Sequence, residues 1–147
     1  MKTLTIQQPY AGLLILGIKK NETRSWNTKH RGKLAIHSSA KMTADGKQTL
    51  EWLSKELPDV FFPGSEAMIM CTRLGMVLGT VNVIETFSTN SSYNVAVHTE
   101  SLERYLGDYS ANRYFWKCED PVQFASPVPA VGKLSIWNWE KPENIKD

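Results

Sequence analysis

The chain has 147 residues, of which 41% are hydrophobic and 22% are charged, and its formal net charge is +2. This length and composition are typical of one soluble globular domain that buries a sizeable core without disulfides or structural metals. The small net charge excludes an overall electrostatic field that would by itself attract nucleic acid. The distribution of charge along the chain therefore carries more information than its sum.

The two cysteines, Cys71 and Cys118, have neither the Cys-x-x-Cys spacing nor the histidine-rich surroundings of a metal site. We therefore expect no metal, no other cofactor and no disulfide framework. Polar residues and Pro9 interrupt the apolar residues between positions 4 and 16, so no signal peptide is predicted, and no apolar run is long enough to cross a membrane. The sequence predicts a single cytoplasmic domain over residues 1–147 with no membrane partner, and it leaves the oligomeric state open.

The first half of the chain is predicted to alternate between short strands and helices. Pro9 suits the first turn of a helix and Gly17 suits its end, while Pro58 ends a second helix. In chain order, the predicted elements are a strand at 2–6, a helix from Pro9 to Gly17, a loop or short strand at 19–26, a strand at 32–38 and a helix from about Thr43 to Leu57.

The second half is predicted to contain longer strands. The segment 75–87 is too long for one flat strand, so Gly79 is expected to mark a bulge or a bend. Thr99 is predicted to cap a short helix that Gly107 ends. Two aromatic-rich strands follow, at 113–119 and 132–139. Long strands with scattered short helices favour the α+β class and a small, closed or half-closed β-barrel, with an open α+β sheet as the alternative.

Basic residues are concentrated between positions 19 and 41, where Glu22 is the only acidic residue. The cations of this segment are Lys19, Lys20, Arg24, Lys29, Arg31, Lys33 and Lys41. Such a concentration predicts a positive face that attracts phosphates and binds them in a salt-dependent way. The alternative interpretation is a solvated loop with surplus lysines.

Three charged side chains within this segment form the most specific candidate site. In an extended stretch, residues two apart share a face, so Glu22 and Arg24 are expected to point into one pocket. Arg24 offers a planar donor fork for a phosphate or a base edge. Lys19 and Glu22 are the catalytic candidates if the protein is an enzyme, with Lys19 as the base and Glu22 tuning it. The alternative is a structural ion-pair network that anchors the first helix.

Other residues are candidates for contact with a ligand in the same cleft. His37 lies on a predicted strand, where a hydrogen-bonded structural role competes with a binding role. Aromatic residues near the end of the chain, Tyr114 among them, belong to the core or stack on bases. The full set of predicted ligand-binding residues is Gln8, Lys19, Glu22, Arg24, Trp26, His37, Lys41 and Tyr114.

Several blocks of the sequence follow a known pattern. They are residues 4–11, the Gly-x-Lys-x-x-Glu-x-Arg run at Gly17, Lys19, Glu22 and Arg24, the strand at 31–39, and the ending from Tyr114–Trp116 through 127–129 to 132–137. In this order the blocks resemble the ASCH domain family, a branch of the PUA-like superfamily. The resemblance touches both ends of the chain and leaves 43–72 unmatched. It implies a PUA-like β-barrel with a cleft beside the first helix, lined by the motif residues.

The resemblance also implies a function. RNA binding is the role usually inferred for this family, so RNA or a nucleotide-like ligand is the expected partner. Some members are similar to ribonucleases or to amidohydrolases of acylated cytidine, which makes a hydrolase the alternative. The amidohydrolase branch has a threonine nucleophile where this chain has Glu22. A small interaction protein with an unused cleft is the third interpretation.

Overall fold

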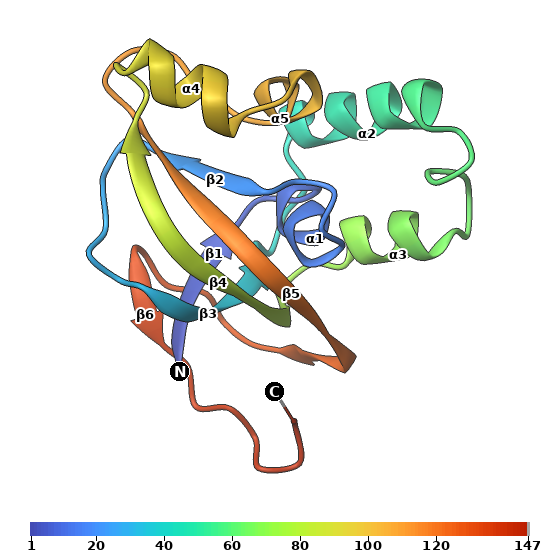
Figure 1. Cartoon of the computed structure of the whole chain (residues 1–147). Coiled ribbons are helices and arrows are strands. Elements are labelled where there is room, and N and C mark those ends of the chain that lie inside the picture. The colour runs from blue at the N-terminus through green and yellow to red at the C-terminus, as the bar shows by residue number, and fades with distance from the viewer. Residues whose placement is uncertain (147) are drawn as a thin grey trace.

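The computed structural model describes residues 1–146, which form a six-stranded sheet and five helices (Figure 1). The strands are β1 (Lys2–Ile6), β2 (Asn21–Arg24), β3 (Gly32–Ser38), β4 (Met76–Ser88), β5 (Tyr114–Pro129) and β6 (Ile136–Asn138). The helices are α1 (Tyr10–Ile15), α2 (Ala44–Glu56), α3 (Glu66–Thr72), α4 (Ser92–His98) and α5 (Ser101–Tyr105).

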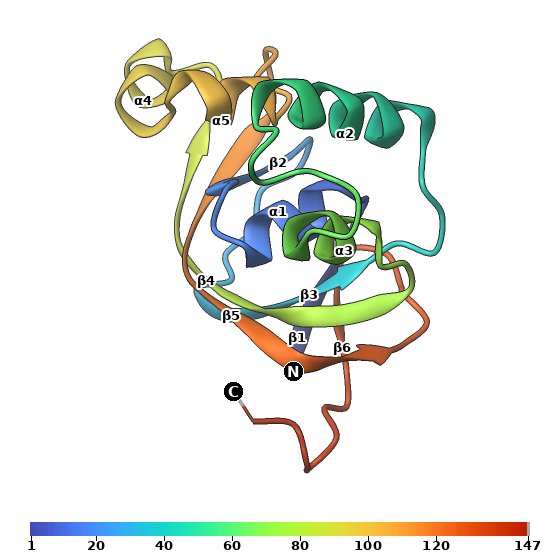
Figure 2. The ribbon, with the colours of Figure 1, turned by 90° about the vertical axis from the view of Figure 1, so that its right-hand side faces the viewer.

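The sheet has the order β2-β5-β4-β3-β1-β6, and only the β1–β3 pair is parallel. It is strongly curled, and α1 lies within its concave side (Figures 1 and 2). The two edge strands, β2 and β6, are not paired with each other, so the sheet is a half-barrel. The α+β class and the small curled β-barrel with flanking short helices, which the sequence predicts, are confirmed.

Helix α1 is the centre of the packing because almost all of its residues are buried. Five of its six residues, 11–15, are inaccessible to solvent, as expected of a helix surrounded on every side. Leu14 packs in a cluster with Leu4, Ile36 and Trp116 of the sheet, whereas Leu13 packs in a second cluster with residues of α2 and α3. The helix thus joins the sheet to the helical layer.

The sequence predicts β1, β3, α1 and α2 within one or two residues. The register of β4 against its neighbours shifts around Gly79, which confirms the bulge expected there. The prediction for Thr99 is wrong: this residue ends α4, and Glu100 is the N-cap residue of α5. The strand predicted at 113–119 continues to Pro129, and the one predicted at 132–139 covers only Ile136–Asn138.

Two helices were not predicted because their sequences give weak signals. Helices α3 and α4 have seven residues each, too few for a clear hydrophobic period. Helix α4 has no buried residue, so no apolar stripe marks it. Both have a serine cap, Ser65 and Ser91, that accepts a bond from a backbone N–H.

Glu103 of α5 fixes the position at which the first edge strand begins. Its carboxylate accepts hydrogen bonds from the backbone N–H of Lys20, at 2.8 and 3.0 Å, and from the backbone N–H of Asn21. The Glu103 residue is only 6% exposed, and burial raises the pKa of its carboxyl, although Lys19 and the two backbone N–H groups lower it. A buried carboxylate therefore ties the start of β2 to the helical layer.

Replacing Gly79 by alanine should destabilise the sheet. A Cβ at Gly79 would lie 2.0 Å from the carbonyl oxygen of Val122 on β5, so one strand has to move. We expect a loss of about 2 kcal/mol or more in the free energy of unfolding. Gly75 is the matched control, because its φ is +66° and a Cβ there meets nothing within 4 Å. Gly75→Ala should cost only about 1 kcal/mol. If urea denaturation gave equal losses of unfolding free energy for Gly79→Ala and Gly75→Ala, the close approach of β4 to the Val122 carbonyl would be contradicted.

The raised pKa of Glu103 predicts a pH dependence of stability. A carboxyl that binds its proton more tightly in the folded state stabilises the fold fully below its ordinary pKa of 4.5. That contribution is lost as the pH rises through the folded-state pKa. The unfolding free energy of the wild type, minus that of Glu103→Gln, should therefore fall between about pH 4 and pH 7. Urea titrations across this range measure it, and a difference that grew with pH would show that the N–H bonds and Lys19 outweigh burial.

Candidate functional site

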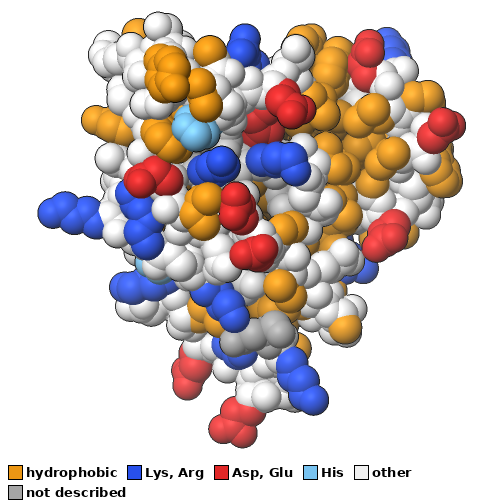
Figure 3. Space-filling view, in the orientation of Figure 1, with side chains coloured by type: hydrophobic (Ala, Val, Ile, Leu, Met, Phe, Trp, Pro, Cys, Tyr) orange, Lys and Arg blue, Asp and Glu red, His pale blue; other side chains and the backbone are white. Residues whose placement is uncertain are grey.

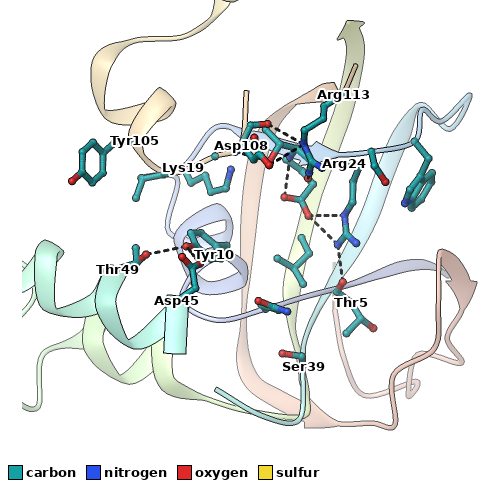
Figure 4. Close-up of a pocket in the computed structure, with 18 of the residues that line it drawn as sticks. Thr5, Tyr10, Lys19, Arg24, Ser39, Asp45, Thr49, Tyr105, Asp108 and Arg113 are labelled. Atoms are coloured by element: carbon teal, nitrogen blue, oxygen red, sulfur yellow. Dashed lines mark hydrogen bonds and ion pairs between the residues drawn. The ribbon is translucent and has the colours of Figure 1, made fainter. Parts of the chain in front are cut away.

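A cleft of about 1060 Å³ opens between β2, α2 and the α5–β5 loop (Figure 4). The start of α1 and residues 133–135 complete its lining. Its volume lies at the upper end of the range for small-molecule sites. Four cations line it, namely Lys19, Arg24, Arg113 and Lys133, together with the acidic residues Glu22, Asp45 and Asp108.

Lys19 reaches the cleft because of the way α1 ends. Gly17 has a φ of +74°, and the backbone N–H groups of Ile18 and Lys19 both return to the carbonyl of Leu13. The Lys19 residue is only 2% exposed, and its Nζ donates to the carbonyl of Asn21. Within residues 1–146, no carboxylate oxygen lies within 4.0 Å of this ammonium. A buried positive charge therefore lines the cleft with one of its three donors used.

Glu22 and Arg24 form an ion pair on the same face of β2. The Nη2 and Nε atoms of Arg24 lie 3.0 and 3.1 Å from Oε2 of Glu22. Nη2 also donates to the carbonyl of Thr5 on β1, at 2.8 Å (Figure 4). The other oxygen of Glu22 accepts from the backbone N–H of Thr23 at 3.1 Å. Glu22 therefore orients Arg24, and Arg24 links the edge strand to the opposite part of the sheet.

Arg113 comes from the end of the α5–β5 loop and lines the cleft, with its Nη2 3.5 Å from the carbonyl oxygen of Thr23 on β2. Its Nε is 3.5 Å from Oδ2 of Asp108, and hydrogen bonds from Ser110, followed by Arg113 itself, lower the pKa of the Asp108 carboxyl. Asp108 also donates its backbone N–H to the hydroxyl of Thr23 at 3.2 Å. The loop is thereby fixed against β2.

The opposite wall of the cleft is formed by α2 and the start of α1. The hydroxyl of Tyr10 donates to Oδ2 of Asp45 at 2.6 Å and lies 2.9 Å from the hydroxyl of Thr49 (Figure 4). Burial, and then the bond to Asp45, raises the pKa of Tyr10 to about 12. The phenol therefore stays protonated at neutral pH and keeps donating to the carboxylate.

Two aromatic rings extend this wall. Trp52 of α2 and Tyr105 of α5 are stacked, with ring centroids 4.0 Å apart and an interplanar angle of 13°. Both line the cleft. Tyr105 is 64% exposed, whereas Trp52 is half-buried and packs against the cluster of Leu53 and Phe61.

The structure brings together four of the eight ligand-binding residues predicted from the sequence. Lys19, Glu22, Arg24 and Trp26 line the cleft, and Trp26 packs edge-on against the buried Trp116, at 5.0 Å between ring centroids. The remaining four, Gln8, His37, Lys41 and Tyr114, do not line it.

The hydrogen-bonding groups of Gln8 and His37 are used inside the fold. The amide nitrogen of Gln8 donates to the carbonyls of Met70 and Arg73, and its oxygen accepts from the backbone N–H of Gly12. Nδ1 of His37 pairs with the hydroxyl of Thr5 at 3.0 Å, and Nε2 lies 2.7 Å from the carbonyl of Ala130. Burial lowers the pKa of His37, so the ring is neutral and donates from Nε2.

The basic residues between positions 19 and 41 do not all lie on one face of the fold. Only Lys19 and Arg24 of its seven cations line the cleft. Arg31 is paired with Glu85 at 2.9 Å and lies outside the cleft. On the face shown in Figure 3, acidic side chains lie among the basic ones. The cleft, and not an extended patch, is where the cations of distant segments meet.

Sequence reasoning missed the residues that α2, α5 and the following loop contribute. Asp45, Gln48, Thr49 and Trp52 recur at three- and four-residue spacing on α2, away from the apolar side of the helix. That second stripe was a usable signal. No pattern local to the sequence could place Tyr105 or Arg113 beside it.

The described residues, 1–146, contain no group of three or more His, Cys, Asp or Glu side chains that could hold a metal ion. Burial raises the pKa of the thiols of Cys71 and Cys118 to about 12, so both are protonated at neutral pH. In the same part of the chain, every helix is too short or too polar to cross a membrane.

Comparison with known proteins gives the chain a family. Residues 4–127 match the ASCH domain. Activating signal cointegrator 1 from Homo sapiens is 29% identical over 139 residues, and the protein of the same name from Mus musculus is 28% identical over 139 residues. Both alignments cover 91% of this chain and 21% of the relative, so the chain spans about one fifth of the length of these proteins.

Two solved structures are similar in outline. The ASCH protein from Zymomonas mobilis aligns with 87% of this chain and 72% of its own, at 10% identity and a TM-score of 0.49. A single-substitution mutant of it aligns with 87% and 74%, at 10% identity and a TM-score of 0.47. Because the family match covers residues 4–127, far more than half of the sequence, this protein belongs to the ASCH domain family.

Proposed function

We propose that the cleft binds RNA or a nucleotide-like ligand, in a cytoplasmic protein, and that Lys19 contacts a phosphate or another anionic oxygen of that ligand. The observation that carries the proposal is the environment of the Lys19 ammonium. It is almost completely buried, it donates one hydrogen bond to the carbonyl of Asn21, and it lines an open cleft.

A buried charge with so few partners costs stability. Moving an ammonium out of water is unfavourable unless hydrogen bonds and an opposite charge replace its hydration. Glu22 makes no ion pair with Lys19, and its carboxylate oxygens bond to Arg24 and to the backbone N–H of Thr23. Glu103 acts on Lys19 only through the longer-range field, as the effect of Lys19 on the pKa of Glu103 shows. An anion bound in the cleft would complete the site.

Arg24 supports the same ligand class. Its Nε and Nη2 groups are held by Glu22 and Thr5, so the guanidinium plane is fixed before a ligand arrives. The donors on Nη1 have no partner among residues 1–146 and can serve a phosphate oxygen. Arg113 and Lys133 add two further cations to the same cleft. The net charge of only +2 favours directed contacts of this kind over binding by a general positive field.

A hydrolase acting on RNA or a modified nucleoside is the second candidate, with Lys19 and Glu22 as its catalytic residues. It requires a nucleophile next to a base. In the part of the chain that the structure describes, neither Lys19 nor Glu22 bonds to a hydroxyl group. The Thr23 hydroxyl accepts from Asp108 instead. These contacts support binding more directly than catalysis.

Replacing Lys19 by methionine should separate binding from stability. Met retains the length of the apolar stem and removes the buried charge, so the free energy of unfolding should change by less than about 1 kcal/mol or increase. Binding of short single-stranded RNA, measured by fluorescence anisotropy, should weaken by about tenfold to a hundredfold, as for the loss of a hydrogen bond to a charged group.

Lys20→Met is the control, because Lys20 is exposed and lies outside the cleft. It should bind as the wild type does. Equal losses for Lys19→Met and Lys20→Met would show that general charge governs binding, and absence of RNA binding by the wild-type protein would refute the proposal.

Arg24→Ala should weaken RNA binding more than Lys29→Ala does. Arg24 is held in the cleft by two partners, whereas Lys29 is an exposed residue outside it. We expect about a tenfold loss for Arg24→Ala and less than about twofold for Lys29→Ala, since a remote surface charge is screened by salt. Thermal melts of both variants establish that they are folded. If Lys29→Ala were the weaker binder, the phosphate contacts would lie outside the cleft.

A further inference from the structure

The wall of the cleft opposite the cations has a different chemistry. Asp45, Gln48, Thr49 and Trp52 fall on one stripe of α2 and all line the cleft. Helix α2 is separate from the motif-bearing strand β2. The stripe combines hydrogen-bonding groups with an aromatic ring, which is the combination that recognises a planar polar molecule.

We propose that this wall, completed by Tyr105, binds an unpaired nucleobase whose phosphate lies on the cationic wall. The inference rests on the proposed function, and it deepens that function by naming the ligand class. The ligand is a single strand or a nucleotide, not a duplex.

Tyr105 carries the argument. Trp52 covers one face of its ring at 4.0 Å, and the Tyr105 residue is nevertheless 64% exposed. The exposed part of the ring is therefore available to a second planar group. Stacking of a base on such a ring is tolerant of sequence, because every base has a π-face. Trp52 packs against the buried cluster that contains Leu53 and Phe61, so the core holds the platform in position.

Hydrogen-bonding groups lie next to the platform. Gln48 is exposed, lies one helical turn before Trp52, and its amide has no partner among residues 1–146. Asp45 and Thr49 are already bonded to Tyr10, which fixes their positions along the same stripe. The Gln48 amide offers both a donor and an acceptor to a base edge. A base would therefore be held by stacking on Tyr105 and oriented by hydrogen bonds to Gln48.

The arrangement of the two walls favours an unpaired base. Lys19, Arg24 and Arg113 lie on the β2 side of the cleft, and Tyr105 lies at its α5 side (Figure 4). A nucleotide whose phosphate lies on the first side and whose base stacks on Tyr105 would have that base separated from the neighbouring bases. Bases in a duplex are stacked and paired, and reaching this wall would cost the energy of unstacking.

Binding should be compared between the wild type, Tyr105→Ala, Tyr105→Phe and Tyr93→Ala. The probes are a short single-stranded RNA, a single-stranded DNA of the same sequence, the RNA duplex, and a single-stranded DNA with abasic sites. Tyr93→Ala is the matched control, because Tyr93 is 74% exposed on α4 and does not line the cleft.

We expect the wild type to bind the single strands more tightly than the duplex or the abasic strand. Tyr105→Ala should lose about fivefold to a hundredfold in affinity for the single strands, Tyr105→Phe should retain it, and Tyr93→Ala should bind as the wild type does. Preference for RNA or DNA identifies the source of the base. Unchanged affinity in Tyr105→Ala, or equal affinity for the abasic strand, would overturn this inference and leave the proposed function intact. No binding of any probe by the wild type would overturn both.

Discussion

The geometry of the cleft depends on one carboxylate that accepts hydrogen bonds from the backbone. Glu103 of α5 receives the N–H groups of Lys20 and Asn21, at the point where the chain leaves α1 and becomes the edge strand β2. Lys19 directly precedes this tie, and Glu22 and Arg24 follow it. Strand β2 is paired on one side only, with β5, and the Glu103 carboxylate adds a second attachment at its first residue. Because burial raises the pKa of Glu103, the stability that these hydrogen bonds contribute is expected to depend on pH.

Three charged residues of one short motif have different structural roles. Glu22 is an orienting group, since both of its oxygens are bonded within β2. Arg24 joins β2 to β1 through its hydrogen bond to the carbonyl of Thr5, and its Nη1 donors remain available to a ligand. Lys19 and Glu22 are both buried, but Lys19 has no carboxylate oxygen within 4.0 Å of its ammonium. Glu22 and Arg24 thus form a structural ion pair that links β2 to β1, whereas Lys19 takes no part in it.

The sequence predicted those parts of the fold that have local signals. The position of β3, the start of α2 near Thr43 and the bulge at Gly79 are read directly from spacing and residue type. Helix α4 escaped prediction because it buries nothing, and Thr99 was misassigned because α4 ends where α5 begins. The side of the cleft that carries Glu22 and Arg24 was predicted, because residues two apart on a strand share a face. The other side was not, since Trp52, Tyr105 and Arg113 meet only after the sheet has curled around α1.

The lengths of the strands have a consequence for association between molecules. The central strands β4 and β5 have 13 and 16 residues, whereas the edge strands β2 and β6 have only four and three. Unpaired edges are templates for intermolecular strand pairing, and short ones offer few backbone groups to a second chain. The sheet can therefore remain open between β2 and β6 without exposing a long strand edge that would promote aggregation.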